Sequence, residues 1–115
     1  MPKNIYAPVD ASKVPRFSDV ATFLRTKRID INSEIDIGLC GVPFDIGLNY
    51  RTGPREAPGA VRHHSRLIRQ VHQTSNIQPH EICNIADIGD APINPLNKDE
   101  SIKNIHEYFA KIKAN

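Results

Sequence analysis

Polar and charged side chains gather at two places where the sequence predicts that a strand ends. The first group follows the apolar run 35–42 and comprises Asp45, Asn49, Tyr50 and Arg51. In parallel α/β folds, ligands bind at the carboxyl ends of strands. These four residues are therefore predicted to face a substrate, at a pocket rim, or a neighbouring subunit. The alternative is that Asp45 and Arg51 bond to the local backbone or to each other and shape the turn.

The second group is a pair of carboxylates, Asp87 and Asp90, at the end of a predicted strand over residues 82–88. Two carboxylates at a strand end can bind a metal ion or act as an acid/base pair. Because no histidine stands beside them, we expect instead that they cap a loop or pair with an arginine. The five histidines of the chain also lack the spacing of metal ligands. The sequence therefore predicts neither a catalytic residue nor a metal site in this chain.

The elements that position these residues alternate along the chain. The run 35–42 is almost continuously apolar, which is typical of a parallel strand buried on both faces. A helix is predicted over residues 58–71, with Arg62, Arg66 and Arg69 mostly on its solvated face. Its apolar face is predicted to consist of Ala57, Ala60, Val61, His64, Ile68 and Val71.

A last helix follows the second strand. Asn97 and Glu100 have the spacing of a capping box, which marks a helix start. The apolar stripe of this helix is Ile102, Ile105, Phe109 and Ile112. The order strand, helix, strand, helix predicts an α/β fold with a parallel sheet and helical crossovers. Two strands and two helices cannot cover both faces of a sheet, and so the domain is expected to be incomplete in this chain.

The first 34 residues are predicted to form an arm. Three prolines in residues 1–17 favour extended structure. Ser18 can cap a short helix that ends near Thr26, with Val20, Phe23 and Leu24 on its apolar side. The predicted organisation is thus an arm with a short helix over residues 1–34 and a β-α-β-α portion over residues 35–115.

The composition and the charge of the chain indicate which kinds of partner it does not bind. The formal net charge of +2 is too small to indicate a nucleic-acid partner. No run approaches the roughly 18 apolar residues that a membrane span needs. The first ten residues lack the apolar core of a signal peptide, and both cysteines lie within apolar runs. These features favour a cytoplasmic protein that binds neither nucleic acid nor a membrane.

The stretch 41–62, GVPFDIGLNYRTGPREAPGAVR, resembles the first strand, loop and helix of the ureohydrolases, which include arginases, agmatinases and guanidinobutyrases. The family pattern is G-x-P-x-D-x-G, then R-x-G, then G-P or A-P followed by a small residue, an aliphatic residue and arginine. The later stretch 84–95, NIADIGDAPINP, is similar to the family's second strand with its D-x-G-D end. Pro15, Arg16 and Phe17 resemble the arm of the agmatinase and guanidinobutyrase branch. The matching residues of the first stretch are Gly41, Pro43, Asp45, Gly47, Arg51, Gly53, Ala57, Pro58, Ala60, Val61 and Arg62.

The resemblance implies a three-layer αβα sandwich around a parallel sheet, of which this chain is the N-terminal portion. It also implies two divalent metal ions, usually manganese and sometimes nickel, which activate a hydroxide that attacks a guanidinium carbon and releases urea. The family's ligand motifs are Gly-Gly-Asp-His, Asp-Ala-His-x-Asp and Asp-x-Asp-x-x-Asp-Pro, and none occurs here.

The resemblance therefore implies one set of functions for a longer parent enzyme and another for this chain. The parent is expected to act on agmatine, guanidinobutyrate, guanidine or a similar compound, and to be a homo-oligomer, either a trimer or a hexamer. The chain alone is expected to bind no metal and to be inactive, with Asp87 and Asp90 in supporting roles. The alternative is a non-catalytic subunit or interaction module derived from a ureohydrolase.

Overall fold

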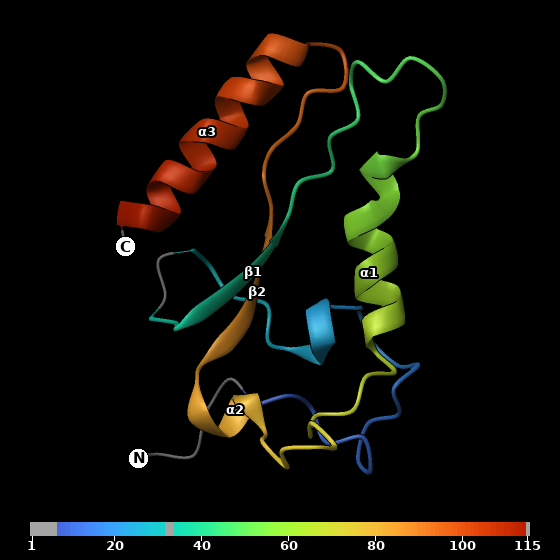
Figure 1. The fold of residues 1–115 in the computed structure, drawn as a ribbon, viewed down its shortest axis with the longest axis vertical. Coiled ribbons are helices and arrows are strands. Elements are labelled where there is room, and N and C mark those ends of the chain that lie inside the picture. Colours follow the sequence, from blue (N-terminus) through green and yellow to red (C-terminus); the bar gives the residue numbers. More distant parts are fainter. Residues whose placement is uncertain (1–6, 32–33, 115) are drawn as a thin grey trace.

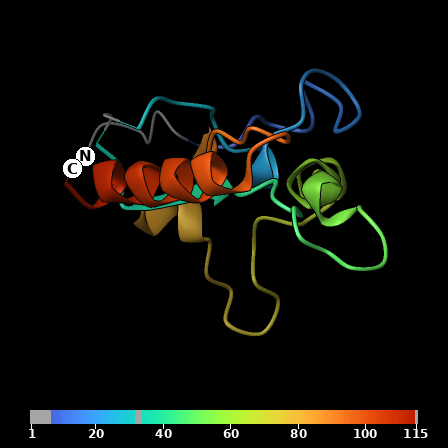
Figure 2. The same cartoon turned by 90° about the horizontal axis from the view of Figure 1, so that it is seen from above.

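The computed structural model describes residues 7–31 and 34–114. In Figure 1 two strands lie between α3 (Lys98–Ala114) and α1 (Ala57–Ser65), and in the view from above α3 overlaps the strands while α1 lies to one side (Figure 2). This αβα arrangement confirms the predicted α/β fold with a parallel sheet. In chain order the elements are η1 Phe23–Arg25, β1 Ile37–Gly41, η2 Pro54–Glu56, α1 Ala57–Ser65, α2 Pro79–Ile82, β2 Ile85–Asp90 and α3 Lys98–Ala114.

The strand β2 is paired along both of its edges. On one edge it pairs in parallel with β1. On the other edge, Arg28 and Asp87 form a parallel bridge. The Ile29 N–H donates to the Asp87 carbonyl over 3.0 Å, and the Asp87 N–H donates to the Lys27 carbonyl over 3.0 Å. Every residue of β2 except its last is consequently buried.

The prediction that the first strand is buried on both faces is wrong. Within the predicted run 35–42 the strand β1 occupies Ile37–Gly41, and only Gly41 in it is buried. Ile37 keeps 43% of its surface exposed. Among the described residues, β1 has a strand partner only in β2, which explains its exposure. The second strand begins later than the predicted residue 82, because α2 ends there.

The helix α1 ends at Ser65, well before the predicted residue 71, and it buries a different face. Pro58 and Ser65 are its buried residues, and Arg62 between them is partly buried. These three residues are spaced by three or four positions and so share one face of the helix. The prediction that Arg62 lies on the solvated face is wrong. The residues of the predicted apolar face that are exposed are Ala57, Ala60, Val61, His64 and Ile68.

The predicted helix over residues 18–26 is only a short 3-10 turn, η1. Leu24 and Arg25 have φ values of +55° and +57°, and this left-handed conformation does not continue a right-handed helix. The Thr22 hydroxyl donates to the Thr26 carbonyl over 2.6 Å. Such side-chain bonds to the local backbone compete with helix formation. Phe23 is buried as expected, whereas Val20 is 84% exposed.

The last helix, α3, forms as predicted. The Asn97 side-chain oxygen accepts a 3.0 Å hydrogen bond from the Glu100 N–H, which is one half of the predicted capping box. The other half does not form, because the Glu100 carboxylate accepts from Asn94 Nδ2 and the Asn97 N–H donates to the Asn94 carbonyl. The Tyr108 hydroxyl donates to the Ile88 carbonyl over 3.2 Å and joins α3 to β2. The predicted apolar stripe is only partly covered, since Phe109 is 42% exposed.

Hydrogen bonds of buried polar side chains hold the elements of the interior in place. The three largest fully buried side chains are all polar, namely Thr26, Asp87 and Ser101. Because an unpaired buried polar group is costly, the partners of such groups fix how the elements sit together. The buried apolar residues are Phe23, Ile85, Ala86, Ile88 and Ala91.

Candidate functional site

A β-bulge at the end of β2 sets the direction of the two carboxylates. Leu39 pairs with Asp87, and the next residue, Cys40, pairs with Gly89, so that β2 holds one extra residue. Gly89 has a φ of +88°, a conformation that glycine adopts readily. In a regular strand, residues three apart point to opposite faces, and one extra residue reverses this relation. Asp87 and Asp90 therefore both reach towards α1.

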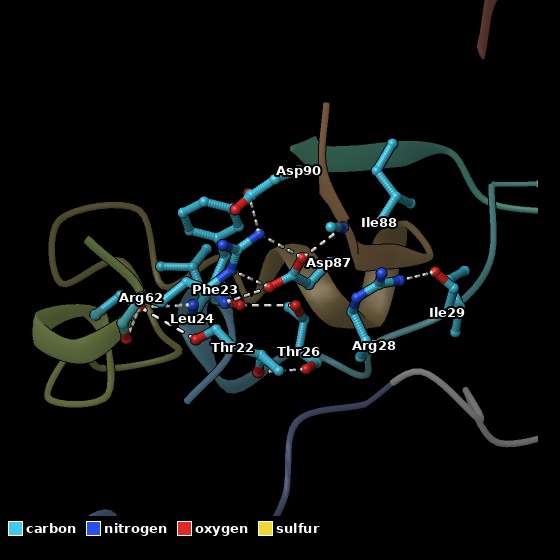
Figure 3. Close-up of polar contacts among 12 residues, drawn as sticks. Thr22, Phe23, Leu24, Thr26, Arg28, Ile29, Arg62, Asp87, Ile88 and Asp90 are labelled. Carbon is cyan, nitrogen blue, oxygen red and sulfur yellow. Dashed lines mark hydrogen bonds and ion pairs between the residues drawn. The ribbon is translucent and has the colours of Figure 1, made fainter. Parts of the chain in front are cut away.

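Both carboxylates bind the guanidinium of Arg62 on α1 (Figure 3). The Arg62 Nε lies 2.9 Å from Asp87 Oδ2, and its Nη2 lies 3.1 Å from Asp87 Oδ1. The same Nη2 lies 2.8 Å from Asp90 Oδ1. The Asp87 side chain is fully buried and that of Arg62 is 14% exposed. This is an ion pair held inside the protein, and the pairing with an arginine expected from the sequence is present.

The ring of Phe23 completes the Arg62 cluster, by which we mean Phe23, Arg62, Asp87 and Asp90. The Arg62 Cζ lies 4.2 Å from the centroid of the Phe23 ring, a cation–π geometry. The Phe23 N–H also donates to Asp87 Oδ2 over 3.0 Å. The contacts of the Arg62 cluster thus hold together η1, α1 and β2.

Asp87 and Arg62 each keep their charge at neutral pH. Burial, the largest single influence, acts to raise the pKa of Asp87. Hydrogen bonds from Arg62 and from the Phe23 and Gly89 N–H groups outweigh burial, and the pKa of Asp87 lies below its ordinary value. Hydrogen bonding to Asp87 raises the pKa of Arg62 in return. The pair is therefore ionised, and neither member is suited to exchange protons with a substrate.

Asp45 forms a second ion pair at the base of the loop after β1. Its carboxylate is buried and accepts from the Arg55 Nε over 2.9 and 3.0 Å, and from the Gly53 N–H over 2.9 Å. The Arg55 hydrogen bond, followed by the Gly53 N–H, lowers the pKa of Asp45 from 3.8 to about 2. Asp45 thus bonds the local backbone, as the turn-shaping alternative held, whereas its side-chain partner is Arg55 and not Arg51. Asp45 therefore connects the two ends of the loop, because its carboxylate binds Gly53 and Arg55.

The other predicted residues of this loop lie on its surface. Asn49, Tyr50 and Arg51 are exposed, and Tyr50 is 84% exposed. The Arg51 guanidinium carbon lies 5.0 Å from the centre of the Tyr50 ring, and its Nη2 lies 3.3 Å from the Tyr50 hydroxyl. The structure therefore separates the four residues predicted together: Asp45 is inside the loop and three are outside.

The described side chains do not fit a metal centre. Within residues 7–31 and 34–114, no group of three or more His, Cys, Asp or Glu side chains could hold an ion. Asp87 already accepts hydrogen bonds on both oxygens, and Arg62 also binds Asp90. Both acids therefore neutralise an arginine, and both oxygens of Asp87 are already used.

Three residues of these clusters escape prediction from the sequence. Periodicity assigns Arg62 to solvent and Phe23 to a helix, and Arg55 has no predicted role, although all three bind or stack on charged partners. One signal points to Arg62, since it ends the family pattern in the stretch 41–62. Hydropathy alone gives no such signal, because it scores arginine as exposed.

The chain matches known proteins along most of its length. The family model described as "Arginase family" matches residues 35–115. A guanidinopropionase of Pseudomonas aeruginosa is 37% identical over 107 residues, which are 93% of this chain and 34% of that protein. A guanidinobutyrase of the same organism is 34% identical over 115 aligned residues, covering 97% of this chain and 36% of that protein. The chain thus spans about a third of the length of these curated relatives.

A solved structure shares the fold. The proclavaminate amidinohydrolase of Streptomyces clavuligerus superposes with a TM-score of 0.79 at 28% identity, over 84% of this chain and 33% of that one. This chain therefore shares its fold with about a third of that amidinohydrolase. No helix in residues 7–31 and 34–114 has the length and apolar character needed to cross a membrane.

Proposed function

The chain belongs to the arginase family, and from that membership we propose that it forms the N-terminal part of an amidinohydrolase that releases urea from a small guanidino compound. The observation that carries this proposal is the match of 93% and 97% of the chain to a guanidinopropionase and a guanidinobutyrase. In the proposed reaction, water adds to the guanidinium carbon. The bond from that carbon to the substituted nitrogen breaks, the amine leaves with a proton, and the products are the amine and urea.

The contribution of this chain to that reaction is to shape the edge of the sheet. We propose that residues 1–34 are an arm and that residues 35–115 are the first β-α-β-α portion of the domain. The Arg62 cluster supports this proposal, because it ties the arm turn to α1 and β2 through buried charges. Asp87 and Asp90 then act as supporting residues that hold the strand end in place.

The loop after β1 is proposed to lie at the pocket rim or at a subunit contact. Asp45 holds the base of the loop, and Asn49, Tyr50 and Arg51 are presented on its surface. Any divalent metal ions, manganese or nickel, are proposed to be held by residues outside the described part, since the described acids do not fit as ligands. We propose that the parent enzyme is a cytoplasmic homo-oligomer, a trimer or a hexamer.

The test is urea release by the polypeptide encoded by the complete reading frame. The substrates are 3-guanidinopropionate, 4-guanidinobutyrate, agmatine and free guanidine, each assayed with manganese, with nickel and after chelation. We expect urea from at least one substrate, and loss of activity after chelation. An absence of urea from all four substrates with either metal would overturn the proposal and would favour a non-catalytic module.

The 115-residue chain provides the matched control in the same assay. It carries both the Arg62 cluster and the loop after β1 and is expected to release no urea. Urea release by this chain alone would contradict the placement of the reactive groups outside the described residues.

A further inference from the structure

A hollow of about 580 Å³ lies between the N-terminal arm and the segment that follows α1. We infer that this hollow, called here the arm hollow, binds the phosphate group of a small phosphate monoester. Its charged lining residues are Arg16, Arg25, Arg69 and Asp10. The inference concerns a second site and does not depend on the proposed function.

The arm hollow lies far from the loops that follow the strands. Its lining comes from residues 8–25 and from residues 68–76, which follow the last residue of α1, Ser65. In Figure 1 the arm and this segment lie beyond the lower end of α1, whereas the loops after β1 and β2 leave the sheet at its upper end. Ligands of parallel α/β folds bind at the carboxyl ends of the strands. A ligand in the arm hollow is therefore an effector and not the substrate.

Arg25 is the fixed member of the lining. Its Nη2 donates to the Val14 carbonyl over 3.1 Å, and its main-chain N–H donates to the Thr22 carbonyl over 3.2 Å. The N–H of the neighbouring Leu24 donates to the Ser65 hydroxyl oxygen over 2.9 Å, which joins this turn to α1. Arg25 is thus held in place before a ligand arrives, and such restraint reduces the entropy that binding costs.

The fold leaves the Arg25 guanidinium incompletely satisfied. Among the described residues, its Nη1 is buried and has no hydrogen-bond acceptor. A buried polar group without a partner is costly, and few such groups occur in folded proteins. An anion in the arm hollow would compensate the charge of this guanidinium.

The other charges of the lining also favour an anion. Within residues 7–31 and 34–114, none of the three arginines of the hollow forms an ion pair, since the ion pairs there involve Arg55, Arg62 and Lys103. The acid of the described lining is Asp10, whose Oδ1 accepts from the N–H and the hydroxyl of Ser12 over 2.9 and 2.7 Å. Three arginines and one aspartate give the lining a net charge of +2. A phosphate monoester carries a charge of about −1.5 to −2 at pH 7, which matches this lining.

The kinds of lining residue favour a phosphate monoester over other anions. A carboxylate has two oxygens and matches the planar fork of one arginine, whereas a phosphate group presents three acceptor oxygens to several arginines. The side-chain amides of Gln70, Gln73 and Asn76 also line the hollow and can bond hydroxyl groups. The described lining residues include no aromatic ring on which a nucleobase could stack. The volume lies within the roughly 300–1,000 Å³ that is typical of small-molecule sites.

The experiment is isothermal titration calorimetry of the polypeptide encoded by the complete reading frame. The probe is glucose 6-phosphate, which has a phosphate group, hydroxyl groups and no aromatic ring. We expect it to bind, to bind more weakly as sodium chloride is added, and to bind more tightly than inorganic phosphate or malonate. Glucose, which lacks the charge, should give no heat of binding.

Variants of the lining identify the place of binding. Arg25→Met should raise Kd about tenfold, as expected for the loss of a hydrogen bond to a charged group. Arg16→Met and Arg69→Met remove exposed charges and should each raise Kd about threefold. Asp10→Asn removes the negative charge of the lining and should lower Kd. If Arg25→Met does not fold, the variants of the exposed residues still decide the question.

Lys103→Met and Glu107→Gln are the matched controls. These residues pair with each other on α3, with side chains 74% and 57% exposed, and α3 lies across the strands from α1 in Figure 1. The same losses of charge should leave Kd unchanged at this distant place. If the controls reproduce the changes in Kd, net charge alone explains them and the arm hollow is not the site.

Three results would overturn the inference. The first is an absence of binding by glucose 6-phosphate, and the second is a Kd that no variant of the lining changes. The third is equal binding of glucose 6-phosphate, inorganic phosphate and malonate, which would show no selection for a phosphate monoester. The titration measures no urea, and so its result leaves the amidinohydrolase proposal untouched.

Discussion

Removal of the Arg62 guanidinium should strongly destabilise the fold. Arg62→Met keeps the apolar stem of the side chain and leaves Asp87, which is fully buried, without its ionic partner. Loss of one member of a buried ion pair costs about 3–5 kcal/mol. Asp87 would still accept from the N–H groups of Phe23 and Gly89. We therefore expect the lower end of this range, about 3 kcal/mol of unfolding free energy.

The assay is urea unfolding of the 115-residue chain, followed by far-UV circular dichroism. With an m value of about 1.5 kcal/mol/M, a loss of about 3 kcal/mol lowers the midpoint by about 2 M urea. Arg66→Met is the control, because the Arg66 Nε donates to the His63 carbonyl of the same helix and to no buried acid. Its unfolding free energy should stay within about 0.5 kcal/mol of the wild type.

Chemical rescue distinguishes a lost ion pair from a general packing defect. Arg62→Ala leaves a space between the Phe23 ring and the Asp87 carboxylate that has the shape of a guanidinium ion. Low concentrations of guanidinium chloride should raise the urea midpoint of this variant relative to sodium chloride at equal ionic strength, and should not raise that of the wild type. A midpoint of Arg62→Met equal to that of the wild type would refute the reasoning. A lack of guanidinium rescue would mean that packing, and not charge, dominates the loss.

Three further perturbations test individual features of the fold. Gly89→Ala should cost about 1–3 kcal/mol, because φ is +88° and a Cβ would meet the Arg28 guanidinium; Gly59→Ala in α1 meets nothing within 4 Å and should be neutral or stabilising in the same urea titration. Asn97→Ala removes the α3 cap and should cost about 1 kcal/mol, measurable as lost helical signal at partial denaturation. Because the pKa of Asp45 falls from 3.8 to about 2 on folding, its stabilisation is complete above pH 4 and is lost as pH falls towards 2; Asp45→Asn should flatten this part of the stability profile.

The features predicted correctly are those with local signals. The start of α3 depends on Asn97 and Glu100, which are three residues apart, and the Asn97 half of the predicted capping box forms. The alternation of strands and helices is likewise a local pattern, and it indicates the fold class. The short helix before Thr26 fails for local reasons as well, because threonine hydroxyls bond the nearby backbone and left-handed residues stop the helix.

The features that are missed depend on contacts between distant residues. Hydrophobic periodicity places Val61 inside and Arg62 outside, whereas Val61 is 54% exposed and Arg62 is bound to Asp87, 25 positions later. Hydrophobic periodicity cannot predict this pairing, because the energy of a buried arginine depends on the acid that binds it in the fold. The exposure of β1 has the same origin, since burial of a strand is decided by its neighbours and not by its own residues.

One close-packed unit joins five residues of the two family stretches, namely Gly41, Pro58, Arg62, Gly89 and Asp90. A Cβ on Gly41 would lie 2.6 Å from the Pro58 Cβ and would also collide with the Asp90 carboxylate, so that glycine is required for α1 to approach the strand end. That approach brings Arg62 to Asp90, and the bulge at Gly89 turns Asp90 towards it. The close packing, the bulge and the ion pair involve residues in direct contact. A substitution of any one of them therefore weakens the contacts of the others. Their free-energy costs should therefore not add, and a Gly41→Ala/Arg62→Met double variant should lose less stability than the sum of its single variants.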